Sequence, residues 1–185
     1  MKIHIVLCVS ILLISSSCLM PFNTISIDEN SNLIEILSLE SPLENLLGSE
    51  LMKITASDGL SGDEFGYSTS ISGNTLIIGN CKDDIGANSA QGSAFIYECN
   101  QSYVGGWIEK VKLIASDGKK SDLFGCSVAI DGDTVVIGAR EAKINEELYQ
   151  GAAYIFERNH GGPNNWGEVK KLTAPDGEMY DRLGT

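Results

Sequence analysis

Several residue types are scarce in this 185-residue sequence, which holds two His, four Pro and five Cys. Its 13 Lys and Arg are outnumbered by 25 Asp and Glu, which gives a net charge of −12. The basic surface that binds nucleic acid is therefore absent, and anionic lipid would repel the chain. The sequence also lacks a zinc-site spacing, a Gly-x-Ser-x-Gly elbow, a metalloprotease helix and a phosphate loop. These absences exclude nucleic-acid binding and give catalysis little support.

The rest of the composition indicates a globular chain with many turns. Hydrophobic residues make up 43% and charged residues 21%, which is typical of a folded protein. The length fits about one domain. Twenty Gly against four Pro predict many turns, as short β-strands require.

The N-terminal segment has the layout of a secretory signal peptide. Lys2 precedes an apolar run from Ile5 to Ile14, and residues 15–17 are serines suited to cleavage. We therefore expect residues 1–17 to direct export to the medium or the cell surface. The run is short for a membrane span, which needs about 20 residues. An uncleaved N-terminal membrane anchor that continues through Phe22 is the alternative.

Residues 18–50 form an acidic lead-in in which Asp and Glu lie among leucines and isoleucines. Leu43, Leu46 and Leu47 have the spacing to line a short helix. A disordered segment is the preferred alternative, because chain termini are usually poorly ordered.

An internal repeat is the strongest signal in the sequence. Asp58-Gly59, Asp117-Gly118 and Asp176-Gly177 are 59 residues apart, without insertion or deletion. The same offset joins a series of further matches, namely Phe65-Gly66 with Phe124-Gly125 and Leu183-Gly184, Gly79 with Gly138, Gly92 with Gly151, and Trp107 with Trp166. Residues 51–185 therefore consist of repeats with a 59-residue period.

Each repeat unit predicts four antiparallel strands separated by turn residues. The predicted strands are 65–71, 75–79, 93–98 and 107–114 in one unit, and 124–130, 134–138, 152–157 and 166–173 in the next. A third unit begins at Leu183. The segment Leu51–Ala56 matches a fourth strand with no first three strands of its own, and we expect it to complete a blade elsewhere in the protein.

The residue types change in a consistent direction along each unit. The first strand is rich in Gly, Ser and Ala, the second is almost wholly aliphatic, and the fourth carries lysines. A continuous apolar strand is covered on both faces, small residues suit a crowded axis, and charged residues suit an outer rim. The pattern predicts an all-β fold of four-stranded antiparallel β-propeller blades, spanning about residues 65–114 and 124–173. A β-solenoid is the alternative, and it fits this period poorly.

About two blades plus edge strands make only a partial propeller, because closed rings take roughly 4–8 blades. We therefore expect either missing blades, in a truncated chain, or self-association to close the ring.

The repeated residues resemble the FG-GAP repeat known from the propeller of integrin α subunits. Phe65-Gly66-Tyr67-Ser68 and Phe124-Gly125-Cys126-Ser127 are similar to its Phe-Gly part. Residues 75–80 and 134–139 are similar to its Gly-Ala-Pro part, although Cys81 and Arg140 stand where the proline would be. The resemblance implies an extracellular propeller that binds a protein or another ligand, without identifying that ligand.

The calcium loop of integrin-type repeats cannot be carried over to this chain. That loop lies between the Phe-Gly and Gly-Ala-Pro strands, where this sequence has only the tight turns 72–74 and 131–133. The sequence resembles instead a variant of long secreted microbial proteins.

Acidic residues collect in the loops before the first strand and between the second and third strands. Because antiparallel strands alternate in direction, these loops share one face. Calcium needs several oxygen ligands, so we place a calcium hypothesis on Asp83, Asp84 and Asn88. Turn chemistry is the alternative, because the second unit has Ala142 and Lys143 at the first two of these positions.

Other candidate residues have simpler explanations. Trp107 and Trp166 could stack on sugars, but an aromatic residue at a fixed place in each blade is more often packed between blades. Cys81 and Cys99 fall at opposite ends of a predicted hairpin, too far apart for a disulfide, and buried or free cysteines, Cys126 included, are the expectation. After export His160 is the remaining histidine, and it has no histidine counterpart in the other unit.

The sequence thus predicts a secreted or cell-surface propeller that binds an extracellular protein or glycan and has no catalytic role. A hydrolase or lyase of extracellular polysaccharide, with its catalytic residues in missing blades, is the first alternative. A purely structural segment of a surface array is the second.

Overall fold

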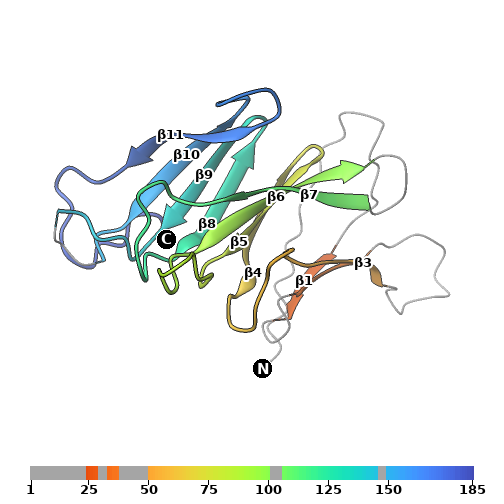
Figure 1. Ribbon diagram of the computed structural model, residues 1–185, viewed down its shortest axis with the longest axis horizontal. Helices are drawn as coiled ribbons and strands as arrows, with labels where there is room; N and C mark the ends of the chain where they lie inside the picture. The colour runs from red at the N-terminus through yellow and green to blue at the C-terminus, as the bar shows by residue number, and fades with distance from the viewer. Residues whose placement is uncertain (1–23, 29–32, 38–49, 101–105, 146–148) are drawn as a thin grey trace.

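The computed structural model describes residues 24–28, 33–37, 50–100, 106–145 and 149–185, and every regular element in these ranges is a β-strand (Figure 1). One four-stranded sheet contains β4 (Phe65–Ser72), β5 (Thr75–Asn80), β6 (Ser93–Asn100) and β7 (Gly106–Leu113). Another contains β8 (Phe124–Asp131), β9 (Thr134–Ala139), β10 (Ala152–Arg158) and β11 (Trp166–Leu172). No described segment forms a helix with the length and apolar character of a membrane span.

These two sheets are the predicted propeller blades. Within each sheet the strands lie in chain order and pair antiparallel. Each strand begins and ends within two residues of its predicted bounds. The all-β prediction and the four strands of each unit are confirmed.

A third sheet corrects two expectations about the N-terminal part. It consists of β1 (Thr24–Asp28), β2 (Leu33–Leu37) and β3 (Glu50–Ile54), in that order. Two stretches of the acidic lead-in are therefore strands rather than disordered chain. Strand β1 alternates apolar with polar residues, which is the period of a β-strand, and β2 is aliphatic apart from Glu35. The acidic residues of the segment had favoured the interpretation as a lead-in. The signal peptide (1–17) and the helix expected around Leu43 lie outside the described residues.

Strand β3 was expected to stand without partners from its own sheet, and this was wrong. It pairs with β2, which pairs with β1, so the sheet repeats the order of the second, third and fourth strands of a blade.

The first blade is buried on both faces, as its aliphatic strand predicts. Ile77 of β5 belongs to a core cluster shared with Ile137 of the second blade. Its neighbours Leu76 and Ile78 face the other way and pack in a cluster with Ile54 of β3. Every residue of β5 is buried. The alternating side chains of one strand thus hold together three successive sheets.

Glycine allows the two blades to approach closely. A Cβ atom on Gly79 of β5 would lie 2.0 Å from the carbonyl oxygen of Gly125, the glycine of the second Phe-Gly motif. Gly138, which matches Gly79 in the next repeat, has the same relation to Gly184, at 1.9 Å. A side chain at either glycine would overlap the neighbouring backbone. The recurring glycines therefore mark blade-to-blade contact.

The Phe-Gly motif also extends the backbone pairing from one blade to the next. Gly92 bridges Phe124 in parallel orientation, and the amide of Phe124 donates to the Gln91 carbonyl over 2.8 Å. Gly151 bridges Leu183 in the same way. Leu183-Gly184 is thus docked on the second blade as Phe124-Gly125 is docked on the first, near the C-terminus marked in Figure 1.

Replacing Gly79 with Ala tests this packing. The added methyl group has to displace the Gly125 backbone, and we expect the free energy of unfolding to fall by about 2–4 kcal/mol. Thermal and denaturant unfolding followed by circular dichroism measures the change. Gly73→Asn is the matched control, because Gly73 has a φ of 56°, nothing lies within 4 Å of its Cβ position, and Asn tolerates that backbone. Equal losses for both variants would contradict the close-packing explanation.

Candidate functional site

Hydrogen bonds between loops bring the acidic segments to one end of the blades. The amide of Ser121 donates to the Ser89 carbonyl over 2.9 Å, and that of Arg182 donates to the Tyr149 carbonyl over 3.0 Å. Each bond joins a loop between the second and third strands to the loop before the next first strand. We call residues 55–64, 81–92, 114–123, 140–145, 149–151 and 173–183 the loop face. The prediction that these loops share a face is confirmed.

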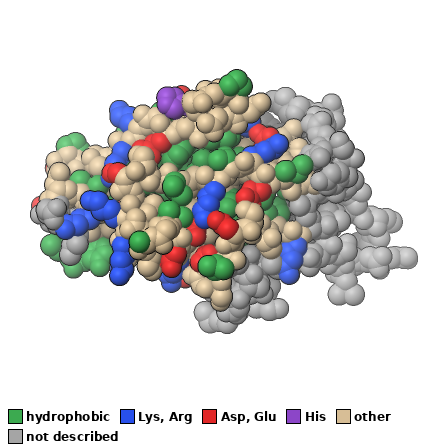
Figure 2. Space-filling model, in the orientation of Figure 1, with side chains coloured by type: hydrophobic (Ala, Val, Ile, Leu, Met, Phe, Trp, Pro, Cys, Tyr) green, Lys and Arg blue, Asp and Glu red, His purple; other side chains and the backbone are tan. Residues whose placement is uncertain are grey.

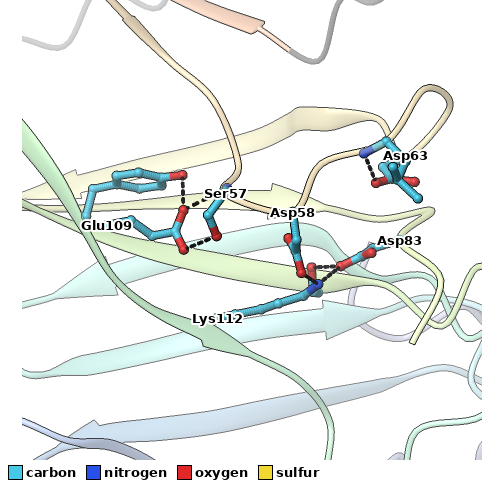
Figure 3. Close-up of polar contacts among 9 residues, drawn as sticks. Ser57, Asp58, Asp63, Asp83, Glu109 and Lys112 are labelled. Atoms are coloured by element: carbon cyan, nitrogen blue, oxygen red, sulfur yellow. Dashed lines mark hydrogen bonds and ion pairs between the residues drawn. The ribbon is translucent and has the colours of Figure 1, made fainter. Parts of the chain in front are cut away.

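The Ser-Asp-Gly turn after β3 is held by the outer strand of the first blade (Figure 3). The Ser57 hydroxyl donates to the Glu109 carboxylate over 2.7 Å, and its amide donates to the other oxygen over 3.0 Å. Lys112, on the same strand β7, donates to Asp58 over 2.7 Å. The turn therefore ties β3 to the blade that follows it.

The same contacts recur one repeat later. The Ser116 hydroxyl and amide donate to Glu168 over 3.0 and 2.9 Å, and Lys171 donates to Asp117 over 2.7 Å. Tyr154 adds a hydrogen bond of 2.9 Å to Asp117. Burial opposes ionisation of Asp117, but Lys171 and Tyr154 outweigh burial and lower the pKa of this carboxyl. The Asp-Gly signals therefore mark contacts between consecutive units.

Lys112 makes one ion pair that Lys171 lacks. Its ammonium lies 2.6 Å from Asp83, which is buried and also accepts a hydrogen bond from the Ser93 hydroxyl. Figure 3 shows the Lys112 ammonium between Asp58 and Asp83. Burial lowers the pKa of Lys112, but its two carboxylate partners outweigh burial and raise the pKa. An internal cation thus neutralises the buried carboxylate.

A second set of aspartates closes the turns before the first strands. Asp63, Asp122 and Asp181 each accept the backbone amide three residues earlier, over 2.7 Å in every case. Burial is the main cause that raises the pKa of both Asp63 and Asp122. These acids are structural residues of the turn.

The three residues of the calcium hypothesis lie in the loop between β5 and β6 with their own protein partners. Asp83 is paired with Lys112, Asp84 accepts the Ala90 amide over 2.8 Å, and Asn88 donates to the Gln91 side chain over 2.8 Å. Within the described part of the chain, no group of three or more His, Cys, Asp or Glu side chains is arranged to hold a metal ion. A calcium site at these residues stays a prediction.

The other singled-out residues lie in the protein interior. Trp107 is 9% and Trp166 4% exposed, and Arg158 lies 4.8 Å from the Trp166 ring, so the packing interpretation of both tryptophans is confirmed. Cys81 and Cys126 are buried thiols, and burial raises the pKa of each. Neither thiol is in an environment that would make it a nucleophile.

The surface charge is mixed despite the large negative total. On the side of the molecule in Figure 2, acidic and basic side chains lie next to one another, without a patch of a single sign. This agrees with the ion pairs of Lys112, Lys171 and Lys82, the last of which lies 2.6 Å from Glu64.

Comparison with known proteins explains this recurring geometry. The FG-GAP repeat model matches residues 49–97 and 107–156, more than half of the chain. The chain belongs to the FG-GAP repeat family. Each match begins at or beside an outer strand, β3 or β7, and ends in the third strand of the following blade, so an FG-GAP repeat includes the Ser-Asp-Gly turn that joins two blades. No curated protein matches the chain.

Sequence reasoning missed the partners of the Ser-Asp-Gly turns and one aromatic pair. Glu109 and Lys112 recur as Glu168 and Lys171, so the 59-residue offset held the signal, but the fourth strand was interpreted only as a charged rim. The aromatic pair, Tyr149 and Tyr180, departs from the repeat, since Ala90 and Ser121 hold these positions one unit earlier.

Replacing Lys112 with Met tests the internal cation. The change leaves the buried Asp83 carboxylate without its cation, and we expect a loss of about 2–4 kcal/mol in the free energy of unfolding at pH 7. Lys171→Met is the matched control, because Lys171 also lies over an aromatic ring and pairs with a turn aspartate, but Ala142 stands at the position of Asp83. The free energy of unfolding of Lys171→Met should fall by less than about 1 kcal/mol.

The pH dependence provides a check on the same variant. Since the folded pKa of Lys112 is raised, its contribution is complete below the ordinary value of 10.5 and disappears as the pH rises through the folded value. The difference between wild type and Lys112→Met should therefore shrink above that pH. A difference that persists unchanged would contradict the ion-pair explanation.

Replacing Asp122 with Asn tests the cost of the buried carboxylate. Asn keeps an oxygen for the Lys119 amide and has no charge, so we expect equal or greater stability than wild type at pH 7, whereas Asp122→Ala should lose about 1 kcal/mol. Because burial raises the folded pKa of Asp122 above its ordinary 3.8, wild type gains stability as the pH falls through the folded value. The greater stability of Asp122→Asn over wild type should therefore disappear below that folded pKa.

Melting temperatures between pH 3 and 8 measure this difference. Asp181→Asn is the control, because Asp181 makes the same turn contact while exposed. A stabilisation of equal size at Asp181, or one that grows towards acid pH at Asp122, would contradict the prediction.

Proposed function

We propose that this FG-GAP chain is part of a secreted or cell-surface propeller that binds an extracellular protein or glycan through its loop face, without catalysis. Export rests on the signal-peptide layout of residues 1–17. The binding role rests on how the loop face divides its residues between structure and surface.

The loops between the second and third strands carry the observation behind this proposal. In loops 81–92 and 140–151, Gln91 and Gln150 recur, and both are buried. Most other positions differ between the two loops, and the exposed ones include Lys82, Asp84 and Asn145. A constant frame with variable exposed loops is how scaffolds carry binding specificity.

The non-catalytic role is supported by the state of the loop-face acids. Asp58 and Asp83 are engaged in ion pairs, and Asp63 closes a turn. Glu109, on the adjoining strand β7, accepts hydrogen bonds from Ser57. A general acid or base would need a carboxyl group that is available to a substrate.

Further blades or a second copy would complete the propeller. Val136 of β9 is 38% exposed, whereas Ile77, its counterpart in β5, is fully buried between two sheets. The outer face of the second blade therefore has the composition of a blade interface. We propose that another FG-GAP repeat covers it.

The test is expression of the full chain with its native N-terminus, followed by cell fractionation and binding assays. We expect the protein in the medium or on the surface, and capture of an extracellular protein or glycan. Substitution of Lys82 and Asp84 with Ser should weaken capture, whereas the control Asn74→Ser, in the turn at the other end of the strands, should not. Retention in the cytoplasm, or turnover of polysaccharide by the purified chain, would overturn the proposal.

A further inference from the structure

Two tyrosines stack on each other at the loop face. The rings of Tyr149 and Tyr180 have centroids 5.3 Å apart and an interplanar angle of 21°. Tyr149 comes from the loop between β9 and β10, and Tyr180 from the segment after β11, so two loops contribute one aromatic surface. Tyr180 is 59% exposed and its neighbour Met179 is 46% exposed. Large apolar groups thus face solvent at a defined place.

The fold sets the backbone at these positions, and it does not require tyrosine there. Tyr149 and Tyr180 have φ angles of 58° and 72°, and their counterparts Ala90 and Ser121 have 52° and 66°. A bulky residue is uncommon in this left-handed region. The first repeat fills the two positions with small side chains, and the second fills both with aromatic rings.

The exposure of Tyr180 is a property of its position on the loop face. Ser121 occupies the same position before the second blade and is exposed, although a complete blade follows it in the structure. A following blade therefore leaves this position open to solvent. The same is expected of Tyr180 when a further FG-GAP repeat follows.

We propose that Tyr149 and Tyr180 form a stacking platform for a neutral oligosaccharide, and this inference rests on the proposed binding function. One face of a pyranose ring presents C–H bonds and is apolar, so it stacks on an exposed aromatic ring. Glu178 and Arg182 lie in the same loop and are exposed, and they offer an acceptor and donors for the sugar hydroxyls.

The size and charge of the site favour a neutral glycan over other partners. A stable protein interface covers about 800 Å² on each partner and has a buried apolar centre. The exposed apolar side chains of this loop are few, namely Tyr180 with Met179 and Leu183, and Tyr149 stacks on Tyr180. The net charge of −12 disfavours sulfated or uronic-acid glycans through repulsion. The buried Trp107 and Trp166 cannot serve this purpose, because neither ring is accessible to a ligand.

The test applies the full chain to an array that carries neutral hexose and N-acetylhexosamine oligosaccharides beside sulfated, uronic-acid and sialylated ones. The neutral oligosaccharide that binds most strongly on the array is then titrated by calorimetry against wild type and variants. We expect binding to neutral glycans, a loss of about tenfold or more for Tyr180→Ala and Tyr149→Ala, and near-wild-type affinity for Tyr180→Phe, which keeps the ring.

Tyr67→Ala is the matched control, because Tyr67 is 45% exposed but contacts Arg140 and lies outside the platform. It should leave glycan affinity unchanged, and circular dichroism confirms that each variant is folded. Neutral-glycan binding that survives both alanine substitutions would overturn the platform while leaving the proposed function intact. An array with no bound glycan, combined with capture of an extracellular protein, would also overturn the platform and leave the proposed function intact. The absence of binding in both assays would overturn the proposed function as well.

Discussion

The structure depends on a contact between backbones that glycine alone permits. Between Gly79 and the carbonyl of Gly125 there is no room for a side chain, and the next repeat has the same contact between Gly138 and Gly184. This approach places Phe124 against Gly92 and buries the aliphatic strand β5 on both faces. It also fixes which loops meet at the loop face. The spacing of glycines in the sequence is thus the spacing of blade contacts in space.

Electrostatics at the loop face follow from that packing. Once the blades are in contact, the Ser-Asp-Gly turn of one unit lies beside the outer strand of the next. There Glu109 accepts a hydrogen bond from Ser57, and Lys112 pairs with Asp58. The acids that give the chain its negative charge are thus partly used to join repeats. The residues that differ between repeats, with the half-buried Tyr149 and the exposed Tyr180 among them, are the ones that we propose for recognition.

Most of the fold could be predicted from the sequence, because the repeat provided each strand twice. Turn residues and apolar runs at a constant offset placed the strands of both blades within two residues. The strands β1 and β2 could not be recognised in this way, since their segment shows no match at that offset and its acidic residues suggested a solvated lead-in. The acid-rich face was predicted from strand direction alone.

The chemistry of the loop face was harder to predict, since it depends on contacts between repeats. Asp83 was interpreted as a metal ligand because carboxylates and amides cluster around it in sequence, yet its partner Lys112 is far along the chain, on strand β7. Tyr149 and Tyr180 are 31 positions apart and match nothing in the earlier repeat, so no sequence pattern joined them. The strands and turns that repeat were predictable, whereas the side-chain contacts between repeats and the residues that differ required the structure.

Native-state hydrogen exchange at the Phe124 amide tests the central claim most directly. This amide donates to Gln91 across the junction of the two blades, over 2.8 Å, whereas the amides of β9 donate within one blade. If the glycine contacts lock the blades together, the Phe124 amide should exchange about as slowly as the β9 amides, because both exchange only when the joined blades open. Exchange of Phe124 that is orders of magnitude faster, while β9 stays protected, would show that the blades separate and would contradict the account.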